Sequence, residues 1–338
     1  MNFGCTSSLN NDEWVEFQDD FMGTVVTQKI FGKRALEAYN RVTTEICRLE
    51  NLMSFFKKDS DVSRLNQMAG KGEVILSYEV IHTLNEALKY SVLSDGAFEI
   101  TLGLLSKLWR DCGKHAKVPE QNEVNELLKY TGYKALKIDY IARTASLSHP
   151  KVAVDLGGIG KGFAADIATK IYTDFGLTSA FIDLGGNVKT LGRKPDGTEW
   201  VIGVQHPDAP RGILLGVLMV SGQSVVTSGG YERYFAANGT KFHHILDPRS
   251  GWPSDAGLKS TTIICEDSMK ADALATATFI MGMEKGMNLI GKMTGVEAIF
   301  VTEKKEVYVT RGLRDCFVLS DQNNLEWGES HENYRICW

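Results

Sequence analysis

Residues 152–167, VAVDLGGIGKGFAADI, constrain the fold more than any other stretch, because an apolar run leads through glycines directly into a helical pattern. The apolar run 151–156 predicts a strand, and 161–176 has the spacing of an amphipathic helix. Since the run 179–184 predicts another strand, the three segments together predict a βαβ unit with the helix as its crossover. Backbone N–H groups at the start of such a helix can bind phosphate, and Lys161 adds a cation suited to a diphosphate.

Two well-known phosphate-binding motifs do not fit these glycines. A Walker loop needs glycine at position 155 and Ser or Thr at position 162, where the chain has Asp155 and Gly162. The dinucleotide fingerprint needs its third glycine at position 163, which is Phe163. The stretch is therefore either a phosphate-binding loop of another kind or a tight turn without a ligand, and its residues leave both open.

The remaining apolar patterns predict an α+β fold with a sizeable mixed sheet. Apolar residues at helical spacing predict helices over 33–56 and 77–96. A second Gly-Gly pair, within 180–192, has no helix after it and is interpreted as a strand-to-strand turn. Short apolar or alternating runs bounded by turn residues predict further strands at 198–205, 212–220, 259–265, 297–302 and 306–310.

Composition and charge exclude several classes of protein. The 338 residues are 43% apolar and 23% charged, which is typical of a soluble globular chain forming one large domain or two lobes. A formal net charge of -5 without a basic stripe argues against a nucleic-acid partner. The six cysteines are scattered with no C-x-x-C pair, which favours a reducing compartment.

The amino-terminal stretch MNFGCTSSLN bears on location. It lacks the charged and apolar regions of a signal peptide, and no apolar window reaches the length of a membrane span. We therefore expect a cytoplasmic protein without a membrane span. One alternative rests on Cys5 after Gly4, which would suit a lipoprotein cleavage site if an upstream apolar segment had been removed.

A candidate set of oxygen ligands lies in the helical pattern 269–282. Asp272 and Thr276 stand at i and i+4 and so share one face of the helix. A carboxylate and a hydroxyl suit Mg²⁺ and not Zn²⁺. On these residues alone, the alternative is an Asp that stabilises the helix start, with Thr276 merely buried.

Two adjacent histidines, His243 and His244, precede the turn at Asp247 and Pro248. On a strand their side chains point to opposite faces, so only one of them can enter a given site. A histidine held by a rigid turn is well placed as a general base, since its pKa lies near working pH. A buried core histidine and a metal ligand are the alternatives. A serine hydrolase is disfavoured because the chain has no G-x-S-x-G motif.

In order along the chain, these pieces resemble the ApbE family, the FAD:protein FMN transferases. The resemblance runs from about residue 21 to about residue 308, nearly the whole chain. It rests on eight ordered segments: FMGT (21–24), MSFFKKDSDVSRLN (53–66), SDGAFEITLG (94–103), VDLGGIGKG (154–162), FIDLGGNVKTLG (181–192), SVVTSGGYERYF (224–235), HHILDPRSGWP (243–253) and ADALATA (271–277).

The resemblance implies a fold and a reaction. The fold would be one α+β domain of two lobes, related to the tunnelling fold, with a mixed sheet and FAD in the cleft between the lobes. It would span 16–319, between an amino-terminal extension, 1–15, and a polar carboxyl-terminal surface extension, 320–338. The reaction would use Mg²⁺ to join FMN from FAD through a phosphoester to a Thr or Ser of a target protein, releasing AMP.

The family's site residues carry over position by position. His244 matches the histidine that deprotonates the acceptor hydroxyl. Asp272 and Thr276 match side-chain metal ligands, and Gly158 matches the residue that contributes a backbone carbonyl. The positions that match FAD contacts are Met22, Phe56, Ala97, Phe98, Glu99, Asp155, Lys161 and Leu246.

Four positions depart from the family pattern. Glu99 stands where Asp is usual, and Phe56 replaces a common Tyr. Gly230 follows TSG where an acidic residue is frequent, and Ala275 stands where some relatives have a further Asp ligand. These departures bear on flavin geometry and on metal occupancy.

The acceptor would be another protein. The family's acceptor motif is Asp, two residues, Ser or Thr, Gly, Ala, Thr, and the nearest run here, DALATAT (272–278), lacks it. Two other functions fit the same residues: an Mg²⁺-dependent FAD pyrophosphatase that gives FMN and AMP, and a flavin-binding protein without catalysis.

Overall fold

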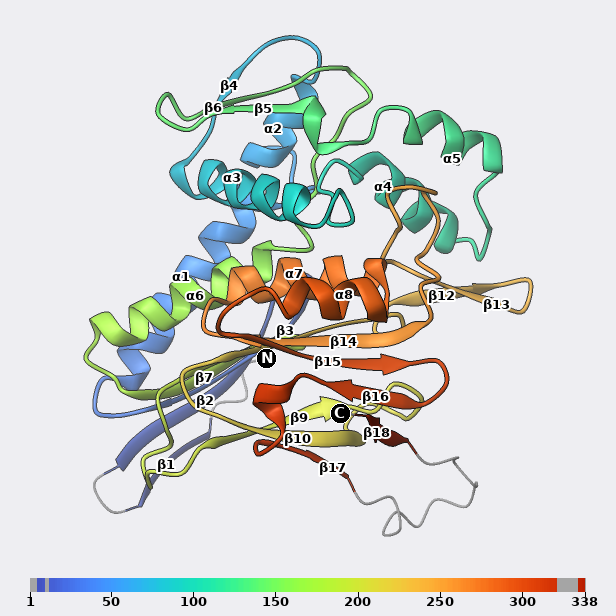
Figure 1. The fold of residues 1–338 in the computed structure, drawn as a ribbon. Helices are drawn as coiled ribbons and strands as arrows, with labels where there is room; N and C mark the ends of the chain where they lie inside the picture. Colours follow the sequence, from blue (N-terminus) through green and yellow to red (C-terminus); the bar gives the residue numbers. More distant parts are fainter. Residues whose placement is uncertain (1–4, 10–11, 321–333, 338) are drawn as a thin grey trace.

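The computed structural model describes residues 5–9, 12–320 and 334–337, and one large sheet runs through them (Figure 1). Its strand order is β1-β2-β3-β7-β8-β11-β14-β15-β16-β18. Neighbouring strands pair antiparallel, except that β16 and β18 pair parallel, so the predicted mixed sheet and the α+β class are confirmed. The strands are β1 (Cys5–Leu9), β2 (Asp12–Phe21), β3 (Thr24–Phe31), β7 (Ser179–Leu184), β8 (Asn187–Leu191), β11 (Ser224–Gly229), β14 (Leu258–Cys265), β15 (Val296–Thr302), β16 (Glu306–Val309) and β18 (Arg335–Cys337).

Helices cover one face of this sheet and a smaller sheet covers the other (Figure 1). The helices are α1 (Ala35–Met53), α6 (Gly160–Asp174), α7 (Ser268–Met281) and α8 (Met283–Ile290). Their apolar sides and the sheet form the main core, which includes Val226, Ile263 and Phe279. The smaller sheet has the order β17-β10-β9 and is built from β9 (Trp200–Gln205), β10 (Leu214–Val220) and β17 (Phe317–Leu319).

The remaining elements form the upper part of the molecule in Figure 1 and one projecting hairpin. The upper elements are α2 (Asp61–Gln67), α3 (Tyr78–Leu93), α4 (Gly103–Gly113), α5 (Gln121–Leu128) and a three-stranded sheet of β4 (Val74–Ile75), β6 (Thr144–Leu147) and β5 (Leu136–Asp139). The hairpin pairs β12 (Tyr234–Ala237) with β13 (Thr240–His243). A separate apolar cluster around Leu105, Trp109 and Val124 joins α4 and α5 to the hairpin.

The strand predicted at 151–156, and with it the βαβ unit, is wrong. Only Ala153 makes a bridge, to Leu102. The side-chain amide of Asn66 donates to the carbonyl of Val154 (2.9 Å) and accepts from its N–H (2.8 Å). Because a side chain satisfies these backbone groups, the segment does not need to pair with a neighbouring strand. The expected second strand, β7, pairs antiparallel with β3 and β8.

Most other predicted elements are confirmed to within a few residues. Helices α1, α3, α6 and α7 lie at the predicted positions, as do β7, β9, β10, β14, β15 and β16. The second Gly-Gly pair forms the predicted strand-to-strand turn, where Gly185 and Gly186 have φ angles of 63° and 90°. Such positive angles favour glycine in a tight hairpin.

Both predicted extensions contribute to the large sheet where the structure describes them. The predicted division between residues 15 and 16 falls inside β2, and Val15 is already buried in the main core. At the other end, β18 pairs with β16, and the buried Tyr334 donates its hydroxyl to Asp208 at 2.6 Å. Residues 321–333 of the predicted surface extension lie outside the described residues.

The contact between α6 and α7 requires glycine at position 162. A Cβ added to Gly162 would lie 2.3 Å from the carbonyl oxygen of Ser268 and 2.7 Å from the Cα of Met269. The carboxylate of Asp166 on α6 accepts the N–H groups of these same two residues, at 3.0 and 2.8 Å. The start of α7 is therefore bound directly to α6.

We predict that Gly162→Ala destabilises the protein by about 1–3 kcal/mol, because the new methyl group overlaps backbone atoms that cannot move aside easily. The control is Gly160→Ala, whose Cβ would meet only Met22 Cε at 3.7 Å and Met53 Sδ at 3.9 Å. This control should be neutral or stabilising by up to ~1 kcal/mol, since alanine favours a helix. Urea unfolding measures both, and equal stabilities would contradict the prediction.

Candidate active site

The first turn of α6 faces Asp272 of α7, which is only 3% exposed. Its Oδ2 accepts the backbone N–H of Gly162 at 2.9 Å. Its Oδ1 lies 3.4 Å from the Nζ of Lys161. A buried carboxylate thus lies between the N-terminus of a helix and the ammonium group of Lys161.

Thr276 lies one turn further along α7 and completes an oxygen-lined corner. Its Oγ1 is 3.4 Å from the Oγ of Ser228 on β11. A Cβ on Gly158 would lie 3.5 Å from the same Oγ1, so the backbone before α6 passes beside it. The structure therefore brings the predicted metal residues Gly158, Asp272 and Thr276 to one place.

A buried hydroxyl supports the fit of a hard cation here. Thr261 pairs with Ser228 across β14 and β11, so both side chains point to the sheet face covered by α7. Thr261 is fully buried, yet its Oγ1 has no hydrogen-bond partner among the described residues. A buried polar atom needs a partner, which a metal-bound water would supply.

The donor set decides which metals fit. It offers one carboxylate and hydroxyls, all oxygen, which suits Mg²⁺ completed by phosphate and water. Within the described residues there is no group of three or more His, Cys, Asp or Glu that could hold a metal by itself. The residues fit a magnesium ion whose remaining coordination positions are filled by phosphate oxygens of a substrate.

Within the part of the chain that the structure describes, one ring nitrogen of His244 has no hydrogen-bond partner. Its Nδ1 lies 3.1 Å from the carbonyl oxygen of Arg233, and its backbone N–H donates to the same oxygen at 3.2 Å. A carbonyl only accepts, so in the neutral ring Nδ1 carries the proton and Nε2 keeps its lone pair. This is the tautomer that a general base needs.

In His243 the other ring nitrogen, Nε2, carries the proton. Its Nε2–H donates to the carbonyl of Ser254 at 3.0 Å, and its Nδ1 accepts the N–H of Ile245 at 3.3 Å. The ring also packs edge-on against Phe279. With both nitrogens bonded inside the protein, His243 has a structural role, and of the two rings the one available for the predicted proton transfer is that of His244.

The electrostatic surroundings keep His244 neutral. Part of His244 is accessible to solvent, but protein surrounds most of the side chain. The resulting loss of hydration lowers the pKa of His244 to about 4. The positive charges of Arg233 and Lys161 act in the same direction. At pH 7 the imidazole is therefore neutral and can accept a proton. The lowered pKa also makes the ring a weaker base.

Two predicted FAD contacts flank the start of α6. Met22 sits in the β2–β3 turn with a φ of 52°, and its Cε lies 3.7 Å from the position of a Cβ on Gly160. Asp155 accepts the N–H of Gly157 at 2.9 Å, and burial raises the pKa of its carboxyl. Phe98 is also near, since its Cε2 is 3.2 Å from the position of a Cβ on Gly158.

Three further predicted FAD contacts, Phe56, Ala97 and Leu246, pack against other parts of the protein. Ala97 and Leu246 are buried, and Leu246 belongs to the apolar cluster around Trp109. Phe56 is 55% exposed, with the guanidinium of Arg110 3.9 Å from its ring centroid. These contacts are to neighbours other than the metal residues, so their role toward FAD stays a prediction.

The carboxylate of Glu99 is occupied by its own surroundings. Its Oε1 accepts from the N–H and the hydroxyl of Thr101, both at 2.8 Å, and its Oε2 accepts the N–H of Tyr133 at 2.6 Å. Burial raises the pKa of this carboxyl, and the hydrogen bonds oppose the shift. In this structure Glu99 fastens the loop that begins near Thr131.

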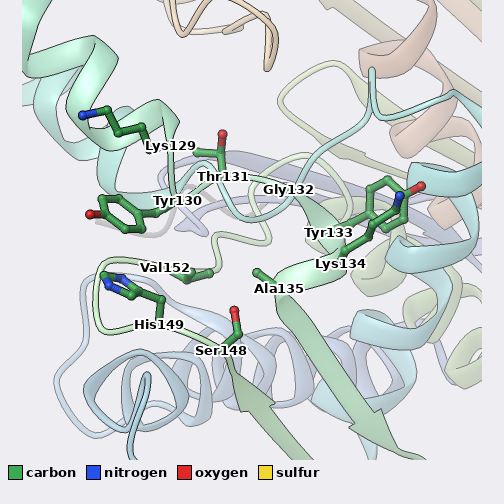
Figure 2. Close-up of a pocket in the computed structure, with 10 residues that line it drawn as sticks. All are labelled: Lys129, Tyr130, Thr131, Gly132, Tyr133, Lys134, Ala135, Ser148, His149 and Val152. Carbon is green, nitrogen blue, oxygen red and sulfur yellow. The ribbon is translucent and has the colours of Figure 1, made fainter.

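That loop forms one wall of a pocket of about 430 Å³ (Figure 2). Tyr130 stacks on His149 at one side, and the exposed Lys129 and Lys134 lie at the rim. None of the predicted site residues lines it; the lining residues are Lys129, Tyr130, Thr131, Gly132, Tyr133, Lys134, Ala135, Ser148, His149 and Val152. The pocket is therefore separate from the corner formed by Asp272 and Thr276.

Comparisons with known proteins show the family to which the chain belongs. The family model described as ApbE family matches residues 22–300. The chain belongs to the ApbE family. It is 37% identical over 316 residues to a protein of Klebsiella pneumoniae (strain 342) named FAD:protein FMN transferase, covering 93% of this chain and 94% of that one. A protein of the same name from Treponema pallidum (strain Nichols) is 33% identical, covering 87% and 86%.

A solved ApbE structure has the same fold. The crystal structure of the ApbE protein from Thermotoga maritima superposes with a TM-score of 0.82 at 32% identity, covering 88% of this chain and 97% of that one. The described residues of the present ApbE chain contain no helix that is both long and apolar enough to cross a membrane.

Four residues near the candidate site were not predicted from the sequence. Ser228 and Thr261 lie on the sheet beside Thr276 and the predicted metal residues, and the carbonyl of Arg233 accepts from His244. Asp183 lies before the second Gly-Gly turn, where burial raises its pKa and Lys161 opposes the shift. Ser228, Arg233 and Asp183 lie in segments that carry the family resemblance, whereas Thr261 does not, and side-chain type alone gave little signal for any of them.

The two histidines should respond differently to truncation. We predict that His243→Ala costs about 1–3 kcal/mol of stability, because it leaves the carbonyl of Ser254 and the N–H of Ile245 without their partner. His244→Ala should cost less than ~1 kcal/mol, since solvent can replace its side-chain bond. Thermal and urea unfolding of both variants measure this, and a reversed order would contradict the assignment of roles.

Proposed function

We propose that this chain transfers FMN from FAD to a Thr or Ser hydroxyl of a target protein and releases AMP. The observation that carries the proposal is the state of His244. Its Nδ1–H is bound to the carbonyl of Arg233, its Nε2 has no partner among the described residues, and the charge of Lys161 acts on the ring from the start of α6. A base, a cation and a set of oxygen ligands thus lie in the same region.

His244 supplies the proton transfer. An alcohol is a poor nucleophile near pH 7, so Nε2 removes the hydroxyl proton as the oxygen attacks the phosphorus of the FMN half. The new bond joins that oxygen to phosphorus, and the bond between phosphorus and the bridging oxygen of FAD breaks. The electron pair leaves with AMP, and the proton on Nε2 passes to solvent.

Asp272, Thr276 and the carbonyl of Gly158 would hold Mg²⁺. When bound, the ion would neutralise negative charge on the transferred phosphoryl group and on the departing AMP. Lys161 lies 3.4 Å from Asp272 and adds a second positive charge at the same place. The main-chain N–H groups at the start of α6 can bind a phosphate oxygen in addition.

The binding residues and the setting belong to the same proposal. FAD would lie in a cleft between the lobes, against Met22, Phe56, Ala97, Phe98, Glu99, Asp155, Lys161 and Leu246. The target would be a flavoprotein with the Asp-x-x-Ser/Thr-Gly-Ala-Thr type of motif. A cytoplasmic location and the domain limits at 16 and 319 remain predictions from the sequence.

FAD hydrolysis is the second candidate, and one observation favours it. His244 is an exposed residue, so water can take the place of the acceptor hydroxyl. The same residues would then yield FMN and AMP. A purely flavin-binding protein is disfavoured, because binding alone needs neither the free Nε2 nor the buried Asp272.

We predict that the protein, incubated with FAD, Mg²⁺ and a domain bearing the acceptor motif, adds one FMN unit to that domain. Mass spectrometry of the acceptor measures the addition. Loss of the base should lower the rate roughly 10²- to 10⁴-fold in His244→Ala, and EDTA should abolish the reaction. Release of FMN and AMP from an unmodified acceptor would instead establish the hydrolase.

The pH profile follows from the lowered pKa of His244. The free enzyme loses its base only when His244 is protonated, so kcat/KM should fall as the pH drops through about 4 and not through 6.5. The rate should therefore be nearly constant between about pH 5.5 and 7.5. Initial rates of acceptor modification across this range measure it, and a midpoint near 6.5 would show that the ring is not desolvated in solution.

A further inference from the structure

Arg233 connects two parts of the site that are distant in sequence. Its carbonyl oxygen accepts the N–H and the Nδ1–H of His244, at 3.2 and 3.1 Å. Its guanidinium donates from Nη2 to the carbonyl oxygen of Gly23 at 2.9 Å. Gly23 follows Met22 in the β2–β3 turn, so a single residue contacts both the base and this turn.

The turn at Met22 has a conformation that needs support. Met22 has a φ of 52° and Gly23 a φ of 71°, and the first of these is unfavourable for a side chain such as methionine. On one side, the N–H of Met22 donates to Oε2 of Glu50 at 3.2 Å. On the other side, the bond from Arg233 holds the carbonyl of Gly23. The turn is thus fastened at both of its central residues.

We propose that Arg233 is a positioning residue, which fixes the base-competent tautomer of His244 through its carbonyl and holds the Met22 turn against the site through its guanidinium. The inference rests on the proposed function, since it assigns His244 the role of base. It adds a residue that none of the sequence motifs marked as functional.

Two physical effects make the side chain matter, although the contact to His244 is through the backbone. Residue 233 lies between β11 and β12 and its side chain is exposed, so the bond to Gly23 is a tether that the strands do not provide. If the carbonyl moves, Nδ1–H loses its acceptor and the ring can turn or change tautomer. The cations of Arg233 and Lys161, and the neighbouring His243, also disfavour protonation of His244.

The test compares three variants in the full-length protein. Arg233→Ala removes both the tether and the charge. Arg233→Lys keeps the charge and one donor, and the bond to Gly23 uses a single N–H, which a lysine can also supply. Arg211→Ala is the matched control, because it removes an exposed arginine, paired with Glu232 at 3.8 Å, whose charge also acts on Asp183, but removes no bond to Gly23.

The first measurement needs no activity. In protein labelled with ¹⁵N-histidine, long-range ¹H–¹⁵N spectra report the tautomer of His244, assigned through His244→Gln. We expect the Nδ1–H form in the wild type, in Arg233→Lys and in Arg211→Ala, and a mixture of both tautomers in Arg233→Ala. An Nε2–H tautomer in the wild type, or an unchanged spectrum in Arg233→Ala, would overturn the proposal.

The second measurement separates binding from chemistry. Misplacing the base should lower kcat for acceptor modification about tenfold or more in Arg233→Ala, with Arg233→Lys and Arg211→Ala within threefold of wild type. A fall in Arg233→Ala no larger than in Arg211→Ala would overturn the proposal. If Arg233→Ala does not fold, Arg233→Lys serves as the test, and loss of the Nδ1–H tautomer in that variant would overturn the proposal. A wild type with the expected tautomer but no transfer would refute the proposed function alone.

Discussion

The packing of α7 on α6 is the interaction on which the candidate site depends. Asp166 accepts the first N–H groups of α7, the cation of Lys189 lies 3.2 Å from this carboxylate, and Gly162 allows the two backbones to touch. Once the helices are joined in this way, Asp272 faces the start of α6. The ligand-bearing residues are therefore positioned by a rigid helix pair, which suits a site whose geometry must be precise.

The adjacent histidines show how backbone carbonyls can assign different roles to the same side chain. One carbonyl takes the Nε2 proton of His243 and another takes the Nδ1 proton of His244. Both nitrogens of the first ring are then bonded, whereas the second ring keeps the lone pair of its Nε2. Neither assignment depends on a charged partner, unlike the carboxylate that orients histidine in many hydrolases.

The sequence predicted those parts of the structure that short-range patterns control. Helical spacing located α1 and α7 and placed Asp272 and Thr276 on one face, and two glycines located the β7–β8 turn. It failed at 151–156, where the amide of Asn66, 88 residues away in sequence, takes the place of a neighbouring strand. The pairing of Arg233 with Gly23 joins residues 210 positions apart, and no periodicity can reveal such a contact.

The last described strand has a consequence for how the protein behaves among its own copies. Without β18, strand β16 would present a row of unpaired N–H and C=O groups, the kind of edge on which other chains assemble. The strand that covers it has three residues and carries the exposed Arg335. A short, charged edge is a poor template, so residues far from the chemistry help to keep the enzyme from aggregating.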